Sequence, residues 1–245
     1  MQSFVSTFSS FLAEAKQEKR VVLLLVSSAI VLTLAWYPGY YTFFLKQSWF
    51  KTSPHRLWWA HLYQFLMDLI LLVGVPVLLI KLVLKENLRD YGVCLGDWRF
   101  ALKYLAVVCV LMAPVLYFGA QDVALQKEYP LVGNLFGQHG ASSMVMWECT
   151  YLLYYIAWEF HFRGVQQLGL ESRVGPVLAI LFQMMASTLI HVRKPFGETF
   201  SAIAGAFIIG ILVWRSRSIL WAILLHWYIG ASTDFWCYIH AKTGG

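Results

Sequence analysis

The stretch LWWAHLYQFLMDLILLVGVPVLLIKLVL, residues 57–84, decides the class of fold, because its length and apolarity suit a lipid bilayer. A helix needs about 20 mainly apolar residues to cross the hydrocarbon core of a membrane, and this run is longer. Comparable runs recur along the chain, at residues 21–37, 100–120, 143–170, 174–190, 199–214 and 219–239. The sequence therefore predicts an all-α, polytopic transmembrane helical bundle of about seven spans, with six or eight spans as alternatives.

The composition supports the same class of protein. Hydrophobic residues make up 59% of the chain and charged residues only 13%, and the mean hydropathy is +0.61. These values leave too little polar surface to cover a soluble globule of 245 residues. Because the apolar runs are spread over the whole chain with short connections, we expect one polytopic membrane domain, residues 1–245, without a separate soluble domain.

The N-terminal segment, residues 1–19, has the pattern of a helix that lies in the headgroup plane of a membrane. Its apolar side chains recur at i, i+4, i+7, i+8 and i+11, at Phe4, Phe8, Phe11, Leu12 and Ala15. Charged residues such as Glu14 and Lys16 take other positions, which makes the helix amphipathic. We interpret the segment as an interfacial helix and not as a cleaved targeting peptide, with a solvated polar tail as the alternative.

The net charge of +6 does not indicate nucleic-acid binding, because the 19 Lys and Arg residues lie in the connections between the apolar runs. Basic residues in short loops mark the cytoplasmic side of a membrane protein. With seven spans and a cytoplasmic N-terminus, 12 of these residues fall on the N-terminal side and 7 on the other. The distribution predicts a cytoplasmic N-terminus and no nucleic-acid partner.

Ionisable residues inside the predicted spans indicate a functional site. The stretch WEFHFRG, residues 158–164, places Glu159 one helical turn before Arg163, the favourable order for an i, i+4 ion pair. His191 ends the fifth run, and His226 lies in the last one, two turns before Asp234. Such groups cost a few kcal/mol each at the centre of a span and usually face a partner or a cavity.

The depths of three of these residues are compatible with one site. Counted from the turn near Ser172, Glu159 lies ~20 Å and His191 ~28 Å into the membrane at 1.5 Å per residue. His226 lies ~12 Å from the loop at Arg217, which is on the same side as Ser172. Tilted helices would bring the three together at middle depth.

A carboxylate with two histidines from separate helices suits a metal-assisted or water-activating hydrolase. Neutral imidazoles bind a metal or polarise a carbonyl, and the carboxylate removes a proton from water. Each residue also has a structural interpretation. His191 could cap a helix at the interface, His226 could hydrogen-bond a neighbouring helix, and Glu159 with Arg163 could be a buried structural pair.

Three motifs in order resemble the CPBP intramembrane metalloproteases, a family that includes the type II CAAX prenyl endopeptidases. They are WEFHFRG, then SxxxH at residues 187–191 followed by Lys194-Pro195, then RSRSILWAILLHW at residues 215–227. The resemblance covers about residues 151–234, and weaker similarity to bacterial members extends to residues 90–92 and 95–98. We take residues 143–239 as the family core and WEFxFRG as the pattern of a bacterial subfamily.

The resemblance implies a helical membrane fold in which an EExxxR motif and two later histidines surround a catalytic cavity with a bound water. By position, Glu159 matches the second glutamate, Arg163 the arginine, and His191 and His226 the two histidines. Two positions depart from the pattern. The first glutamate, the usual water activator, is Trp158, and the asparagine expected as oxyanion donor is Gly230.

The function predicted from these residues is an intramembrane endopeptidase. Glu159 would activate water, and His191 and His226 would bind the developing oxyanion or, together with Glu159, zinc or another divalent metal. The substrate would be a peptide or lipidated peptide, the other partners membrane lipids, and the location the bacterial cytoplasmic membrane. The alternative is a non-catalytic relative, a scaffold or immunity-type protein that binds a peptide or lipid in the same cavity.

Secondary candidates complete the predicted site. Glu198 and Asp234 are supporting carboxylates, Glu198 because it follows His191 closely at the start of a span. A polar stripe on the second span faces either the cavity or a hydrogen-bonding partner, and it consists of His61, Gln64 and Asp68. At i+2, His161 should point away from Glu159, and Ser218 suits the N-cap of the last helix.

Overall fold

The computed structural model describes residues 2–133, 136–137 and 140–243, and within these residues every regular element is a helix. Five helices are long and apolar enough to cross a membrane, namely Lys19–Lys46, Arg56–Leu84, Trp98–Gly119, Pro176–Arg193 and Phe196–Ser216. The predicted all-α, polytopic membrane bundle is therefore confirmed, while the number of seven spans stays a prediction. Met1, residues 134–135 and 138–139, and residues 244–245 of the predicted single domain lie outside the described residues.

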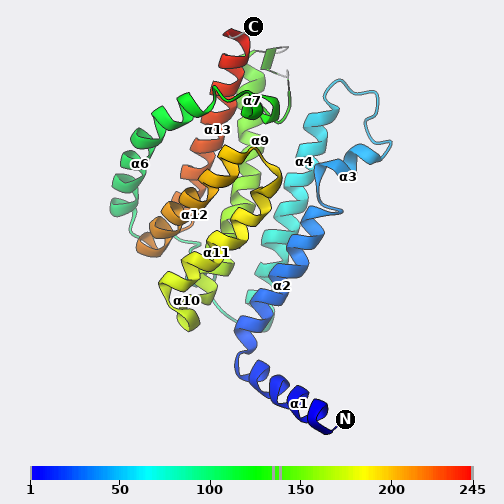
Figure 1. Cartoon of the computed structure of the whole chain (residues 1–245), viewed down its shortest axis with the longest axis vertical. Helices are drawn as coiled ribbons and strands as arrows, with labels where there is room; N and C mark the ends of the chain where they lie inside the picture. Colours follow the sequence, from blue (N-terminus) through cyan, green and yellow to red (C-terminus); the bar gives the residue numbers. More distant parts are fainter. Residues whose placement is uncertain (1, 134–135, 138–139, 244–245) are drawn as a thin grey trace.

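The long helices run in alternating directions between the two ends of the bundle (Figure 1). In chain order they are α2 (Lys19–Trp36), α4 (Arg56–Asp68), α6 (Trp98–Gly119), α9 (Ala141–Glu159), α11 (Pro176–Ile190), α12 (Phe196–Ser216) and α13 (Leu220–Thr243). Short helices connect them or extend their ends, namely α1 (Gln2–Gln17), α3 (Tyr41–Lys46), η3 (Leu88–Tyr91), α7 (Val123–Glu128), α10 (Gly169–Val174) and η5 (His191–Arg193). Helix α9 packs against both α4 and α13, so it lies inside the bundle.

Two of the long helices continue as π-helix, which is rare and often found at functional sites. The second span continues beyond α4 as η1 (Leu69–Gly74), α5 (Val75–Leu78) and η2 (Leu79–Leu84). The α-helical turn between its two π segments contains Pro76, which has no backbone N–H to donate to the helix. Helix α9 continues as η4 (Phe160–Leu168), so the π segment begins directly after Glu159.

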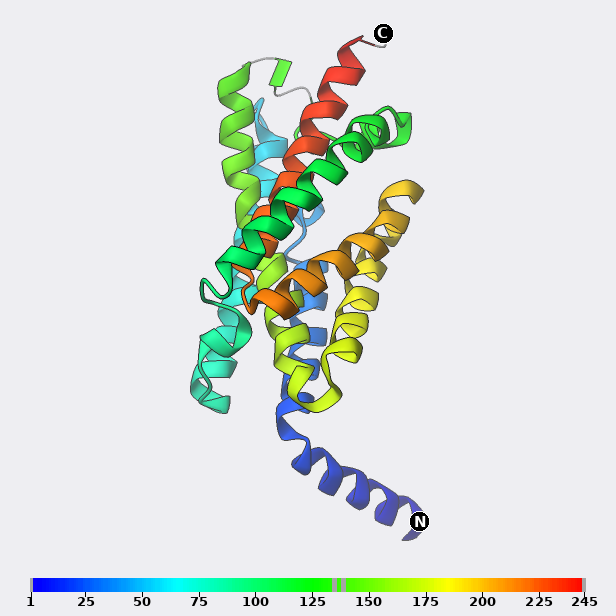
Figure 2. The same cartoon turned by 90° about the vertical axis from the view of Figure 1, so that its left-hand side faces the viewer.

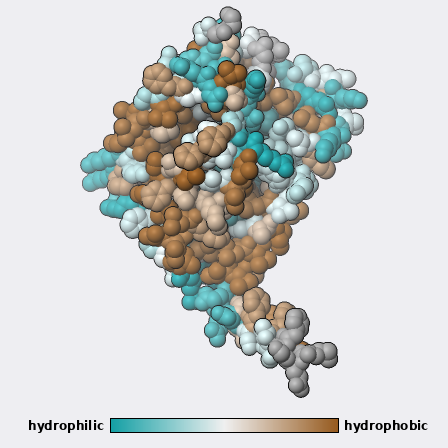
Figure 3. All heavy atoms as spheres, in the orientation of Figure 1, coloured by the Kyte–Doolittle hydropathy of each residue, from teal (hydrophilic) through white to brown (hydrophobic). Residues whose placement is uncertain are grey.

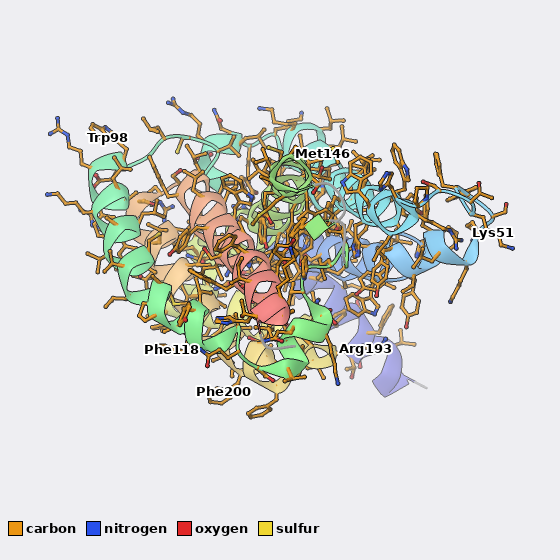
Figure 4. The ribbon with its side chains drawn as sticks, turned by 90° about the horizontal axis from the view of Figure 1, so that it is seen from above. Lys51, Trp98, Phe118, Met146, Arg193 and Phe200 are labelled. Carbon is orange, nitrogen blue, oxygen red and sulfur yellow. The ribbon has the colours of Figure 1, made fainter. Side chains whose placement is uncertain are left out.

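Apolar side chains face outward and polar ones inward, the arrangement expected for a protein surrounded by lipid. Helix α6 exposes Val110 (72%) and Leu111 (65%), whereas all nine residues of η4 are buried. Figure 3 shows apolar side chains over most of one face, with polar ones toward its ends and edges. Seen from the end of the bundle, Phe118 and Phe200 point away from it, as lipid-facing residues would (Figure 4).

The N-terminal helix α1 extends away from the bundle (Figures 1 and 2). Phe8, Phe11 and Leu12 are 54%, 62% and 45% exposed, so their apolar surface is not covered by the rest of the chain. A helix with such exposed apolar residues suits the membrane interface. The helix is confirmed, its location in the headgroup plane stays a prediction, and the side chain of Phe4 lies outside the described part.

A hydrogen-bonded cluster anchors α2 at the end of the bundle nearest the N-terminus. Arg20 binds Glu86 (Nε to Oε1, 2.7 Å) and the carbonyl of Gly169, and the hydroxyl of Tyr91 also donates to Glu86. Partial burial raises the pKa of the Glu86 carboxyl, but the hydrogen bonds from Arg20 and Tyr91 lower it, and the net pKa lies below its ordinary value. Glu86 therefore stays ionised and holds the two chain segments together.

The loop between η3 and α6 joins the ends of α12 and α13 through backbone contacts. The N–H of Asp97 donates to the carbonyl of Ser216 (2.8 Å), and Ser218 Oγ donates to the carbonyl of Cys94 (2.5 Å). Ser218 Oγ also accepts from the N–H of Leu220 (3.2 Å), the first residue of α13. Gly96 has a φ of +58°, and a Cβ there would lie 2.0 Å from the carbonyl oxygen of Ser216.

Gly96→Ala should lower the free energy of unfolding by more than ~1 kcal/mol, because alanine is strained at positive φ and its methyl group would overlap Ser216. Gly205→Ala is the matched control, since no heavy atom lies within 4 Å of a Cβ at that helical position. It should change stability little or raise it by up to ~1 kcal/mol. Thermal unfolding in detergent measures both variants, and equal midpoints would contradict the packing of this loop.

Candidate functional site

Three ionisable side chains meet between α9 and α13. Glu159 Oε1 lies 2.6 Å from Nδ1 of His226 and 3.2 Å from Nη1 of Arg163. The contact with Arg163 joins residues one turn apart, as the i, i+4 spacing predicted, whereas His226 reaches the same oxygen from another helix. One carboxylate oxygen therefore interacts with both partners.

The group is nearly sealed from its surroundings. The side chains of Glu159 and Arg163 are 0% and 2% exposed, whereas that of His226 is 19% exposed. Glu159 Oε2 and Arg163 Nε are buried and have no hydrogen-bond partner among the described residues. A buried charge needs a partner of opposite sign, and Arg163 provides that partner for Glu159.

The residues after Glu159 explain why the motif contains a glycine. Segment η4 is buried throughout, and a Cβ at Gly164 would lie 3.0 Å from the carbonyl oxygen of Tyr91. Glycine thus allows η4 to approach the short helix η3 closely. His161, in the same segment, is fully buried, and its Nε2 lies 3.2 Å from the amide nitrogen of Gln166. The contact with Gln166 holds His161 apart from Glu159.

His191 lies at the end of α11, in the turn that leads into α12. Figure 2 shows that the turn between α11 and α12 ends short of the level reached by α13. Its Nδ1 is 2.8 Å from the carbonyl oxygen of Ser187, which assigns the proton to Nδ1 and leaves Nε2 as an acceptor. Thr199 Oγ1 donates to the carbonyl of His191 (2.5 Å) and holds the turn.

Trp158 packs near both histidines. Its ring centre lies 5.5 Å from that of His191 and 6.3 Å from that of His226, which limits the separation of the two imidazole centres to at most about 12 Å. Trp158, which takes the position of the first glutamate of the family motif, is therefore an aromatic wall of the site. Glu159 and His226 are in direct contact, and the Trp158 ring lies close to both histidines.

The two predicted supporting carboxylates have other partners. Glu198 Oε1 accepts a hydrogen bond from the hydroxyl of Tyr129 (2.6 Å), and Asp234 Oδ2 accepts one from Nε1 of Trp147 (2.6 Å). Within the described residues, no hydrogen bond or ion pair joins either one to Glu159, to Arg163 or to the two histidines. Their role as supporting carboxylates stays a prediction.

The polar stripe on the second span faces the interior of the bundle, but away from the central group. His61, Gln64 and Asp68 are all buried. His61 stacks on Tyr41 with a distance of 4.5 Å between ring centres, and Gln64 Oε1 accepts from the N–H of Tyr41 (3.4 Å). These contacts connect α4 with α3, which fits the structural interpretation of the stripe.

Tyr155 is a site residue that sequence reasoning did not include. Its ring centre lies 4.7 Å from that of His226, and its hydroxyl occupies the space beside Gly230. Tyr155 precedes Glu159 by four residues, so it lies on the same face of α9. This spacing was visible in the sequence, but aromatic residues are so frequent in α9 that it did not distinguish Tyr155.

The side chains do not fit a zinc site of three protein ligands. Within the part of the chain that the structure describes, no group of three or more His, Cys, Asp and Glu residues could hold a metal ion. Glu159 directs its carboxylate to His226 Nδ1 and Arg163, and the His191 ring packs against Trp158. Metal binding by His191, His226 and Glu159 stays a prediction.

A groove on the outer face of the bundle runs between α2 and α11. It has a volume of about 440 Å³ and is lined mainly by apolar residues, including Leu32, Trp36, Leu189 and Ile190. Val192 and Arg193, the two residues after His191, also line it. The guanidinium of Arg193 lies 5.9 Å from the ring centre of Trp36.

The fold and the site define an integral membrane protein with a buried carboxylate, guanidinium and imidazole group that can bind and move protons. Residues 140–232 match the family described as type II CAAX prenyl endopeptidase Rce1-like. No curated protein and no solved structure matches the chain. The matched segment contains all three motifs, so this part of the chain is similar to the CAAX protease family.

Arg163→Ala should lower the free energy of unfolding by ~3–5 kcal/mol, because it leaves the buried Glu159 carboxylate without its cation. Arg215→Ala is the control, since its ion pair with Asp97 is exposed (54% and 39%) and should contribute only ~0–1 kcal/mol. Adding Glu159→Gln to Arg163→Ala should recover much of the loss. Denaturant unfolding in detergent measures all three variants, and an unchanged Arg163→Ala would show that the pair does not stabilise the fold.

Proposed function

We propose that the protein is an intramembrane endopeptidase that hydrolyses a peptide bond of a membrane-associated substrate with water as the nucleophile. The observation that carries this proposal is the 2.6 Å contact between Glu159 and His226 inside the segment that matches the CAAX protease family. Water needs a base to attack a peptide carbonyl, and a carboxylate coupled to an imidazole is such a base.

In this mechanism Glu159 and His226 act as one acid–base unit. Glu159 holds the proton of His226 on Nδ1 and stabilises the imidazolium that forms, which leaves Nε2 to accept a proton. The burial of Glu159 (0%) beside the partly exposed His226 (19%) favours proton transfer through the imidazole. The water oxygen attacks the carbonyl carbon while its proton passes to His226, and His226 then protonates the leaving amine as the C–N bond breaks.

His191 orients the attacking water. Because its Nδ1 donates to the carbonyl of Ser187, its Nε2 is an acceptor and can hold the second hydrogen of the water. Trp158 packs near both histidines and shields the reacting groups from lipid. The sequence assigned the proton transfer to Glu159 alone, and the arrangement in the bundle favours a shared role with His226.

The apolar groove between α2 and α11 suits the substrate. A peptide or lipidated peptide could place its apolar part in this groove from the bilayer, since the residues that follow His191 line the groove. Arg193 in that lining would face the polar part of the ligand. A bacterial cytoplasmic membrane with the N-terminus in the cytoplasm remains the proposed location.

A non-catalytic scaffold or immunity-type protein that binds a peptide or lipid is the second candidate. The observation that favours it is Trp158, which replaces the first glutamate of the family motif with a side chain that cannot accept a proton. In that case Glu159 and Arg163 would be a structural ion pair, and substrate cleavage would be absent.

Glu159→Gln and His226→Ala should each lower the cleavage rate by ~100-fold to 10,000-fold, because either change removes the acid–base unit. The double variant should be no slower than the slower single variant, since groups that act as one unit are not additive. The assay uses the full chain in liposomes with quenched fluorescent peptides, with and without a prenyl group.

Glu171→Gln is the control, because its pair with Arg217 (2.5 Å) lies outside the site and should leave the rate unchanged. If Glu159→Gln cleaves at the parent rate, the carboxylate has another role. If the parent chain cleaves neither peptide but retains them, the non-catalytic binder is the better description.

A further inference from the structure

Two helices present matching pairs of residues to one another. On α9, Tyr155 and Glu159 are four residues apart, and on α13, His226 and Gly230 are four residues apart. Glu159 contacts His226, and one turn away Tyr155 contacts Gly230. The Tyr155 hydroxyl therefore belongs to the same face as the Glu159–His226 unit, ~6 Å along the helix at 1.5 Å per residue.

Only glycine allows Tyr155 to take this position. A Cβ at Gly230 would lie 1.7 Å from the hydroxyl oxygen of Tyr155 and 2.6 Å from the Cζ atom of its ring. Tyr155 is only 3% exposed, and its ring packs against the imidazole of His226 at 4.7 Å between centres. The absence of a side chain at residue 230 thus positions a phenol beside the reacting groups.

The phenol O–H of Tyr155 can donate a hydrogen bond as well as accept one. Its oxygen lies beside Gly230, where a Cβ would be only 1.7 Å away. In a site closed to water, a fixed donor of this kind stabilises charge that develops in a transition state.

We infer that the Tyr155 hydroxyl donates the hydrogen bond that stabilises the oxyanion of the scissile carbonyl group. The assignment rests on the proposed peptide hydrolysis, in which the carbonyl oxygen becomes negative as water attacks. His191 in its tautomer accepts at Nε2, and His226 Nε2 takes the proton from water, so neither histidine is free to donate at that moment. The hydroxyl of Tyr155 on α9 thus takes the role of the family's asparagine donor, whose position on α13 is occupied here by Gly230.

Tyr155→Phe should reduce kcat by ~100-fold to 1000-fold while KM changes little, because the donor acts only in the transition state. Tyr228→Phe is the matched control on α13. The hydroxyl of Tyr228 donates to the carbonyl of Cys109 (3.2 Å), so its loss removes a structural hydrogen bond and should leave kcat unchanged. Both are measured in the liposome assay, with thermal unfolding as the check on folding.

A second experiment moves the donor to the other helix. Gly230→Asn alone should prevent folding, because its side chain would overlap Tyr155. In Tyr155→Ala/Gly230→Asn the space is free and the asparagine amide can donate, so this double variant should cleave faster than Tyr155→Ala. It also supplies the test if Tyr155→Phe does not fold, and a double variant no faster than Tyr155→Ala would contradict the assignment.

The outcomes separate this assignment from the function on which it depends. If the parent cleaves and folded Tyr155→Phe cleaves at the same rate, Tyr155 is not the donor and the endopeptidase proposal stands. If Tyr155→Phe raises KM without lowering kcat, Tyr155 binds the substrate and the assignment is again overturned. If the parent cleaves no peptide, the proposed function fails and the role of Tyr155 fails with it.

Discussion

The buried carboxylate of Glu159 is the constraint on which the rest of the structure depends. A charge at this depth has a high desolvation cost unless it is paired and hydrogen-bonded. Arg163 supplies the cation from the same helix, and His226 brings the second helix to a distance of 2.6 Å. The packing of α4 and α13 against α9 then excludes lipid and water from the pair.

The contact between Glu159 and His226 also fixes the register of α9 against α13. Once these two residues are opposite one another, the residues one turn away must be compatible, and Tyr155 meets Gly230. A larger residue at position 230 would push the helices apart and weaken the carboxylate–imidazole contact. The two departures from the family motif, Trp158 and Gly230, are thus accompanied by a second aromatic residue, Tyr155, that packs on the same histidine.

Much of the fold could be predicted from the sequence, because apolar runs near the thickness of a bilayer determine where helices cross it. The i, i+4 spacing also predicted the contact between Glu159 and Arg163. The pairing between helices could not be predicted, since depth along a span does not determine which faces meet. The π-helical turn after Glu159 left no signal in the sequence, and it shifts all later residues of the motif relative to a straight α-helix.

The arrangement of the histidines favours an enzyme over a purely structural ion pair. Arg163 already neutralises Glu159 from one turn away, so stability alone needs no imidazole from another helix. His226 nevertheless contacts the same oxygen and keeps 19% of its side chain exposed. His191 is held by hydrogen bonds on its Nδ1 and on its carbonyl, which leaves Nε2 as an acceptor. Two imidazoles held in this way near one aromatic ring suit proton transfer, and packing alone does not need them.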